Sequence, residues 1–397
     1  MRRITTLAFA LVLLTGLAAQ GLAQGVDIFE QDGVRDVHLS INGRDLAQLR
    51  ASASENTYYP ADFEYRGIKV RNVGIRSRGL GSRNATKLGL RVDFNRYITG
   101  GTFAGHKALV LDNLWQDASL VRERIAMALF ERVGVPTPRE VFVRVFINGG
   151  YEGLYTITEE LDSQFLTRIG NDNGVLFEYK YVGVWHAEDL GTDSGVYVPL
   201  FEARTHEKQA QQTLYAPLRD LFTASSDASG EAWLGRVESL VDLHQLLAYL
   251  AVETFTSDND GLLGAWGMNN FYLHRGAQGT QHQIVPWDKD QAFGDVDAGI
   301  FLRAEENVLI RQALASPELR AHYLDVLQRC AEIAATDGWL AAQVDAAAAL
   351  VDAAAAQDVR KQFDEATRAE TLAALRAFAV DRPARVLAQV AGARSTR

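Results

Sequence analysis

Hydrophobic and polar positions alternate in several segments of the N-terminal part of the chain, and this period of two predicts β-strands. The alternating segments cover residues 36–43, 63–79, 87–94, 141–147 and 153–161. Asn148, Gly149 and Gly150 separate the last two segments and are typical of a hairpin turn. Residues 117–136 instead repeat their hydrophobic positions about every 3.6 residues, which predicts a helix. We therefore expect a β-rich lobe with one long helix over residues 24–161.

Helical periodicity dominates the rest of the chain. A stripe of leucines runs along residues 242–255 and predicts a buried helix. Two short strands follow at residues 270–274 and 282–287, and the last roughly 90 residues are rich in Ala, Leu and Arg, which favour helix. We expect a mainly helical lobe over residues 162–397, so the fold class is α+β, with two lobes in one domain of residues 24–397.

The first residues have the pattern of an export signal. Arg2 and Arg3 precede an apolar run at residues 7–17, and small residues follow. We expect a signal peptide over residues 1–23, cleaved after Ala23. The alternative is an uncleaved anchor, although the run is short for a transmembrane helix. No later stretch looks long and apolar enough to span a bilayer, so we expect an exported protein in the periplasm, outside the cell or on its surface.

The net charge and the cysteine content exclude a class of partners and a kind of cross-link. The formal net charge is −10, and loss of Arg2 and Arg3 with the signal peptide takes it to −12. Nucleic-acid binding depends on Lys and Arg that neutralise phosphates, so we expect no nucleic-acid partner. The one cysteine, Cys330, excludes an intramolecular disulfide, and its helical surroundings predict a small core residue.

Oxygen-bearing side chains gather at two points of the helical part. One group lies in the loop between the predicted helix and the first short strand, and the other directly follows the second strand. The residues are Asp258, Asp260, Asn269, Asn270, Asp288 and Asp290. If the two strands pair as a hairpin, Asn270 and Asp288 come to the same end of it. Carboxylate and amide oxygens suit a hard divalent cation such as Mg²⁺ or Mn²⁺.

Two other interpretations of this loop are weaker. A calcium loop of the EF-hand type with Gly261 at its sixth position would place Thr256 at the first and Gly267 at the twelfth, and neither is a carboxylate. For Asp260 alone, a turn-forming residue after a helix is a simple explanation. That explanation weakens when Asn270 and Asp288 are considered with it.

The N-terminal part supplies cations in one loop. Residues 76–87 contain Arg76, Arg78, Arg83 and Lys87, together with glycines that let a backbone approach an anion. A solvated basic loop is the alternative, since neither a Walker A motif nor GxGxxG is present. Combined with the Asp and Asn residues of the second part, however, the layout is that of a phosphoryl-transfer site.

These segments resemble the CotH (spore-coat protein H) kinase family, a group of atypical, secretory-type protein kinases. The most specific matches are INGGYEGLYTITEEL at residues 147–161 and IVPWDKDQAFG at residues 284–294. Further matches are NVGIRSRGLGSRNATKLGLRVDF, LWQDASLVRERIA, MNNFYLH and NVLIRQALASPELRAHY. The resemblance implies a bilobal, atypical protein-kinase-like fold that uses ATP.

The resemblance also implies roles for individual residues. Lys87 would bind the nucleotide, with Glu123 as its ion-pair partner. Arg76, Arg78 and Arg83 would lie near the phosphates. Glu159 and Glu160 would lie near the adenine and ribose. The residues at the reacting end are Asp260 as the catalytic aspartate, Asn270 and Asp288 as metal ligands, and Asp290 as an assisting ligand. The loop from Asp260 to Asn270 is longer than in ordinary protein kinases, so Asp258 and Asn269 stay open as alternatives.

We accordingly expect a monomeric kinase that transfers the γ-phosphoryl of ATP to Ser or Thr of a protein, with Mg²⁺ or Mn²⁺. Free ATP is scarce outside the cytoplasm, so the alternative is an exported nucleotide-binding or structural protein of this fold with little or no turnover. A carboxylate-pair hydrolase using Glu159, Glu160 or the aspartates is a third class, and it leaves the basic loop and Asn270 without roles.

Overall fold

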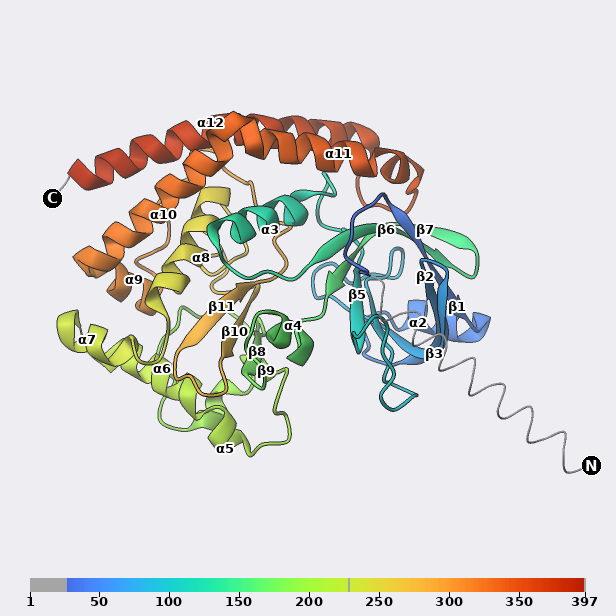
Figure 1. Ribbon diagram of the computed structural model, residues 1–397, viewed down its shortest axis with the longest axis horizontal. Coiled ribbons are helices and arrows are strands. Elements are labelled where there is room, and N and C mark those ends of the chain that lie inside the picture. The colour runs from blue at the N-terminus through green and yellow to red at the C-terminus, as the bar shows by residue number, and fades with distance from the viewer. Residues whose placement is uncertain (1–26, 228, 396–397) are drawn as a thin grey trace, which may run out of the picture. The chain divides into compact units, whose positions relative to one another are not determined.

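The computed structural model describes residues 27–227 and 229–395 (Figure 1). The predicted signal peptide and its cleavage point after Ala23 lie outside the described residues. The described chain packs into two compact units, each assembled from three pieces of chain. Unit 1 contains the described residues up to Leu120, Arg139–Glu160 and Ala348–Arg368, and unit 2 contains Val121–Pro138, Leu161–Ala347 and the residues from Ala369 onward. The lobes predicted from the sequence divide the chain only once, between residues 161 and 162.

Unit 1 is built on a closed barrel with the strand order β1-β2-β3-β4-β5-β7-β6. Its strands are β1 (Arg35–Ile41), β2 (Tyr59–Tyr65), β3 (Ile68–Ser77), β4 (Leu90–Asp93), β5 (Ala108–Asp112), β6 (Glu140–Ile147) and β7 (Gly150–Glu159). Neighbouring strands are antiparallel except for β1 and β6, whose parallel pairing closes the barrel. Closure leaves the sheet without a free edge.

The side chains at the apolar positions of the alternating pattern fill the barrel. Along β1, Val37, Leu39 and Ile41 are buried, while His38 and Ser40 between them are exposed. Each large apolar side chain buried in this way contributes about 1.5–3 kcal/mol. The predicted hairpin is present as β6 and β7, and its turn places Asn148 and Gly149 in the left-handed conformation that this turn type requires, with φ of 51° and 80°.

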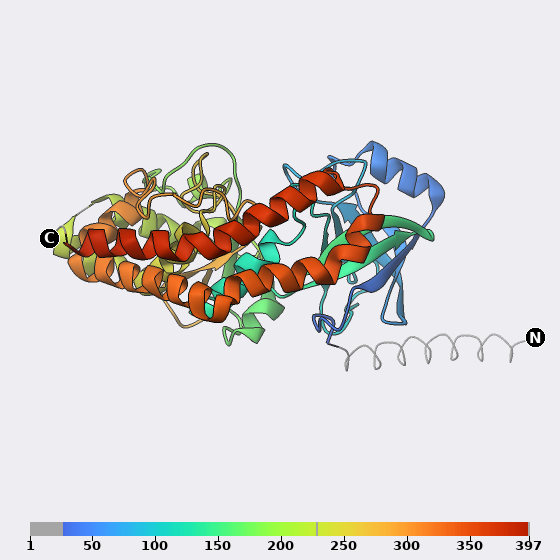
Figure 2. The same cartoon turned by 90° about the horizontal axis from the view of Figure 1, so that it is seen from above.

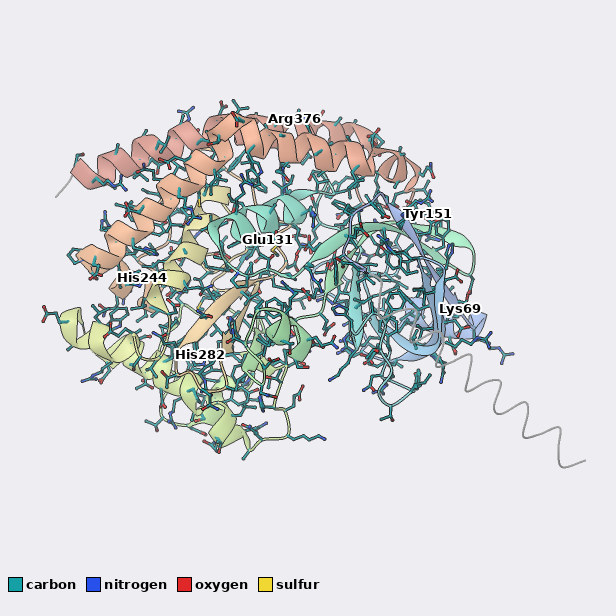
Figure 3. The ribbon with its side chains drawn as sticks, in the orientation of Figure 1. Lys69, Glu131, Tyr151, His244, His282 and Arg376 are labelled. Carbon is teal, nitrogen blue, oxygen red and sulfur yellow. The ribbon has the colours of Figure 1, made fainter. Side chains whose placement is uncertain are left out.

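Unit 1 also includes helical segments from both ends of the chain. Helix α2 (Gly43–Ala51) follows β1 and is capped by Asn42, whose side chain accepts a hydrogen bond from the backbone N–H of Arg44. The C-terminal part of α11 (Trp339–Gln357) belongs to this unit, and the Tyr151 hydroxyl of β7 donates to the Ala354 carbonyl at 2.9 Å (Figure 3). Helix α12 (Glu365–Ser395) begins in unit 1 and continues in unit 2, and Figure 2 shows it as one continuous helix despite Pro383.

Unit 2 combines a four-stranded sheet with the remaining helices. The sheet has the order β11-β10-β8-β9, formed by β8 (Val175–Tyr179), β9 (Phe201–Ala203), β10 (Phe271–Arg275) and β11 (His282–Pro286). The helices are α3 (Arg122–Val133), α4 (Ser163–Arg168), η1 (Ser194–Tyr197), α5 (Gln211–Leu214), α6 (Ala216–Asp227), α7 (Gly230–Val237), α8 (Leu243–Thr256), α9 (Val308–Ala315), α10 (Pro317–Ala335) and η2 (Thr336–Gly338). The predicted small hairpin, β10 and β11, is therefore extended by two strands that the sequence did not reveal.

The structure thus has the α+β class that was predicted, with a β-barrel in the N-terminal part and a mainly helical C-terminal part. Cys330 is fully buried on α10, as expected of a core residue, and burial raises the pKa of its thiol to about 12.

One helical stretch contradicts the expectation that no later segment is long and apolar enough to span a bilayer. Pro317–Gln357, which contains α10, η2 and α11, meets that test by length and composition. It is weak support for a span, because core helices of soluble proteins meet the same test, and α10 buries Leu319, Leu327 and Cys330. The absence of a membrane span in the mature protein stays a prediction.

Candidate active site

The acidic loop of unit 2 begins where α8 ends. Ser257 ends the helix in a left-handed conformation, with φ of 49°, and its N–H still bonds to the carbonyls of Glu253 and Thr254. Asp258 follows, and its Oδ1 accepts a hydrogen bond from the backbone N–H of Asp260 at 3.0 Å. This local bond folds the chain back on itself, as aspartate side chains commonly do in turns. The helix end and the aspartate together therefore fix where Asp260 lies.

Arg382 of α12 supports the same helix end and was not singled out by the sequence. Its buried guanidinium donates to the carbonyls of Thr254 and Phe255 at 2.8 and 2.9 Å, and to those of Val296 and Ala298 at 2.9 and 2.8 Å. The last carbonyls of a helix lack partners within the helix. Arg382 satisfies two of them, and burial lowers its pKa to about 10.

Asp260 is held by two asparagine side chains. The Asn269 amide donates to Asp260 Oδ1 at 3.0 Å, and the Asn270 amide donates to Oδ2 at 2.9 Å and to the backbone carbonyl of Asp260 at 3.1 Å. Burial raises the pKa of Asp260, an effect that Asp258 reinforces and the hydrogen bond from Asn269 opposes. Because the Asn270 nitrogen faces Asp260, its amide oxygen is the atom left to bind a cation.

Asn270 and Asp288 lie at one end of the β10–β11 hairpin, as the sequence predicted. Phe271 pairs with Pro286, and the N–H of Trp287 donates to the Asn270 carbonyl at 3.2 Å. Asn270 and Asp288 both have left-handed backbones, with φ of 56° and 51°. Such conformations are uncommon for residues other than glycine and concentrate at functional sites.

A buried lysine directly follows Asp288 in the sequence. Lys289 occupies the position between Asp288 and Asp290, yet its side chain is only 1% exposed. Its ammonium lies 2.6 Å from Glu253 Oε1 and 3.1 Å from Asp258 Oδ2. Burial acts to lower the pKa of Lys289, but the two carboxylates outweigh it and the net shift is well upward. The lysine therefore carries its charge.

The donors fit a cation that completes its shell with phosphate and water. Among residues 27–227 and 229–395, no three His, Cys, Asp or Glu side chains gather closely enough to hold a metal ion. Mg²⁺ usually takes one or two protein carboxylates together with substrate phosphates. Asp288 and Asn270 at the end of the hairpin, and Asp290 two positions after Asp288, offer two carboxylates and an amide. That is the donor chemistry of such an open site.

The arginines predicted to bind phosphate gather around Ser77 in unit 1. Arg76 donates to the Ser77 carbonyl at 3.0 Å, and Arg83 donates to the same carbonyl at 2.7 Å and to the Ser77 hydroxyl at 3.2 Å. Arg78 forms an ion pair of 3.8 Å with Asp112. Burial lowers the pKa of Arg83, and the charges of Arg76 and Arg78 lower it further. The structure therefore brings these three cations together.

Lys87 is fully buried in unit 1. Its ammonium donates to Asp358 Oδ2 at 2.6 Å and to the Leu154 carbonyl at 2.8 Å, and it lies 5.0 Å from the centre of the Tyr155 ring. Burial lowers the pKa of Lys87, and Asp358 offsets part of that effect. Asp358 is a carboxylate partner of Lys87 that the sequence did not reveal, and the pairing of Lys87 with Glu123 stays a prediction. The contact of Lys87 with a nucleotide stays a prediction.

Glu159 and Glu160 are also engaged with arginines of unit 1. Glu159 Oε1 accepts from the Arg139 side chain at 3.0 Å and its Oε2 accepts from the Arg139 backbone at 3.1 Å. Both oxygens of Glu160 accept from Arg91 Nε at 3.2 Å. Both glutamates are buried. Their predicted place near adenine and ribose is not tested by these contacts, which speak against their use as the free acid and base of a hydrolase.

Comparison with known proteins agrees with the motifs. Residues 75–386 match the model of the family described as CotH kinase protein. The chain is 24% identical over 301 residues to the inner spore coat protein H of Bacillus subtilis (strain 168), which covers 73% of this chain and 79% of that protein. The crystal structure of the Helicobacter pylori proinflammatory kinase CtkA covers 77% of this chain and 93% of its own, with 7% identity and a TM-score of 0.33. That last likeness is too distant to support an argument.

Proposed function

Because the chain belongs to the CotH kinase family, we propose that it is a protein kinase that transfers the γ-phosphoryl of ATP to Ser or Thr of a protein. The family implies a phosphotransferase that uses ATP. We further propose that the barrel and the helical part form the two lobes of an atypical protein-kinase-like fold. The observation that carries the proposal is the Asp260, Asn269 and Asn270 group, with Asn270 at the same end of the β10–β11 hairpin as Asp288.

We assign to Asp260 the role of taking the proton from the acceptor hydroxyl. The side chain of Asp258 is fully buried and already contacts Lys289 and the N–H of Asp260, whereas Asp260 is only partly buried. In the reaction, the acceptor hydroxyl oxygen bonds to the γ-phosphorus, and the bond from that phosphorus to the bridging oxygen breaks to release ADP. The hydroxyl proton passes to Asp260, whose position is fixed by Asn269 and Asn270.

Asn270 and Asp288, assisted by Asp290, would hold Mg²⁺ or Mn²⁺. When bound, such a cation neutralises negative charge on the phosphate oxygens. Arg76, Arg78 and Arg83 would add positive charge for the phosphates. This division of labour agrees with phosphoryl transfer, in which positioning and charge neutralisation supply most of the rate enhancement.

We assign Lys87 to the phosphates, and Glu159 and Glu160 to the adenine and ribose, on the family resemblance. An ammonium has three donors, and Asp358 and the Leu154 carbonyl take two of those of Lys87. Because the side chain is fully buried, a phosphate contact requires its surroundings to open. The same burial favours a second candidate function, an exported protein of this fold that binds nucleotide with little or no turnover.

We also propose that the protein is exported to the periplasm, the outside of the cell or its surface, that it is a monomer with no membrane span after signal cleavage, and that it acts on a protein and not on nucleic acid. The pattern of residues 1–23 and the acidic net charge support this. The acceptor protein is the partner that the proposal requires.

A label-transfer experiment tests the kinase proposal. Residues 24–397 are incubated with Mn²⁺ and ATP labelled at the γ- or the α-phosphate, and label on the chain itself and on an added unfolded protein is counted. We expect transfer from γ-labelled ATP only, reduced on the order of 10²–10⁴-fold in Asp260→Asn. Asp220→Asn, which removes an exposed carboxylate paired with its neighbour Arg219, should match the wild type.

Equal labelling by Asp260→Asn and the wild type would contradict the kinase proposal. Thermal unfolding separates the second candidate, because a ligand that binds only the folded state raises the midpoint. Stabilisation by nucleotide and Mn²⁺ without any transfer supports the binding protein.

A further inference from the structure

We infer that Lys289 is a positioning residue, whose ammonium ties the loop carrying Asp260 to the segment carrying Asp288. The inference rests on the proposed function, since it concerns the same site. Lys289 touches neither the acceptor nor a phosphate in this account. It acts through the two carboxylates of Asp258 and Glu253.

The contacts of Lys289 run directly into the Asp260 loop. The Oδ2 atom of Asp258 lies 3.1 Å from the Lys289 ammonium, and its Oδ1 atom accepts a hydrogen bond from the backbone N–H of Asp260 at 3.0 Å. One carboxylate therefore links the lysine to the backbone of the proposed catalytic residue. Lys289 is covalently joined to Asp288 and Asp290, so these two proposed metal ligands are linked to the backbone of Asp260 through Lys289 and the Asp258 carboxylate.

Glu253 holds the other side of the same loop. Its Oε1 accepts from Lys289 at 2.6 Å and from the Tyr249 hydroxyl at 2.5 Å, and its Oε2 accepts from the N–H of Leu262 at 2.8 Å. A Cβ added at Gly261 would collide with the Glu253 carboxylate, so the loop backbone packs directly on it. The loop is thus fixed at Asp260 through Asp258 and at Leu262 through Glu253, and both carboxylates meet at one ammonium.

The backbone around Lys289 agrees with this role. Asp288 immediately before it has a φ of 51°, and Ser257 immediately before Asp258 has a φ of 49°. Non-glycine residues keep such conformations only when their surroundings fix them. The ion pair joins residues 258 and 289, which directly follow these two residues.

A buried cation between two buried carboxylates has a further consequence. If the ammonium is removed, the carboxylates of Glu253 and Asp258 lose the counter-ion that they share, and burial, which already raises the pKa of Glu253, favours its protonation. The loop is then no longer tied to residue 289, and Asp260 can shift relative to Asp288. Outer-sphere groups that orient metal ligands typically change metal affinity or activity by 10–100-fold when removed.

The test compares Lys289→Met with Lys208→Met, which removes an exposed lysine of unit 2. Mn²⁺ binding is measured by electron paramagnetic resonance with ADP present, and transfer is measured separately as kcat and as KM for ATP. We expect Lys289→Met to keep a cooperative thermal transition but to lose 10–100-fold in Mn²⁺ affinity and in kcat, with Lys208→Met unchanged. A folded Lys289→Met protein with wild-type Mn²⁺ affinity and kcat overturns the inference.

If Lys289→Met does not fold, Glu253→Gln tests the inference instead. This variant keeps the ammonium and its Asp258 contact but removes one of the two charges that hold it, so we expect a 3–10-fold loss in both quantities, in proportion to a weakened clamp. Wild-type values in folded Glu253→Gln overturn the inference. If the wild type itself binds no Mn²⁺ with nucleotide, the proposed function fails and this inference fails with it. If the wild type binds Mn²⁺ and the variants have the same Mn²⁺ affinity and kcat, only this inference fails.

Discussion

In the described part of the chain, Lys87 of unit 1 and Lys289 of unit 2 both bury their ammonium against carboxylate, and their pKa values shift in opposite directions. Lys87 in unit 1 contacts a single carboxylate, Asp358, and burial leaves its pKa below the ordinary value. Lys289 in unit 2 contacts both Glu253 and Asp258, and its pKa lies well above the ordinary value although it is equally buried. For Lys87 the loss of water outweighs one carboxylate, whereas for Lys289 two carboxylates outweigh it.

The difference matches what each lysine is proposed to do. Lys87 has one carboxylate partner, so it has fewer contacts to exchange if its side chain is to reach a phosphate. Lys289 is held from two sides, which suits a residue that fixes the relative positions of Asp260 and Asp288. The two buried ion pairs therefore differ in how many carboxylates surround the cation.

The largest expected effect on stability is that of Lys289→Met. Breaking a buried ion pair by removing one partner typically costs about 3–5 kcal/mol, and here two carboxylates are left behind. Urea unfolding monitored by circular dichroism measures the free energy of unfolding. A loss smaller than that of Lys87→Met would reverse the ranking of the two lysines and break the comparison.

Acid should weaken unit 2 by the next largest amount. His274 of β10 and His282 of β11 are buried, and burial lowers the pKa of each from 6.5 to about 4. Figure 3 labels His282. Between pH 6.5 and 4 the unfolded chain binds protons that the folded chain does not, so stability is complete above pH 6.5 and falls as the pH drops.

From pH 7 to pH 5 the expected loss is about 1–2 kcal/mol for each histidine. His274→Asn and His282→Asn should each remove part of this dependence in urea titrations at the two pH values. Lys208 and other exposed sites serve as neutral controls. An unchanged slope of stability against pH in the double variant would show that acid acts elsewhere.

The smallest expected effect is that of Asp358→Asn. The asparagine oxygen can still accept from the N–H of Leu154, which donates to Asp358 Oδ2 at 3.0 Å. Lys87 can then lose its proton rather than remain an unpaired charge, because its pKa is already lowered. We expect a loss of about 1–3 kcal/mol, below that of Lys289→Met, in the same urea experiment. A larger loss than for Lys289→Met would mean that the unit 1 pair is the rigid one.

The sequence anticipated the parts of the site that follow from local pattern. Two short alternating segments predicted the β10–β11 hairpin, and the hairpin places Asn270 and Asp288 at one end. The barrel strand β1 and the β6–β7 turn were equally local. Strands β8 and β9 were missed, because they are short and their partners lie far along the chain.

The buried ion pairs could not be predicted in the same way. Lys87 and Asp358 are 271 positions apart, and Lys289 and Glu253 are 36 apart. Lys289 between two aspartates has the pattern of a solvated polar run, and only the fold shows that it points inward. Arg382 similarly has the sequence of an exposed helix position and is fully buried.

The most direct test of the account is the rate of γ-phosphoryl transfer measured over a range of Mn²⁺ concentrations for the wild type and Asp288→Asn. We predict that the wild-type rate rises with Mn²⁺ to a plateau and vanishes with a chelator, and that the rate of Asp288→Asn stays on the order of 10³-fold lower throughout. A curve for Asp288→Asn that overlies the wild-type curve would contradict the account.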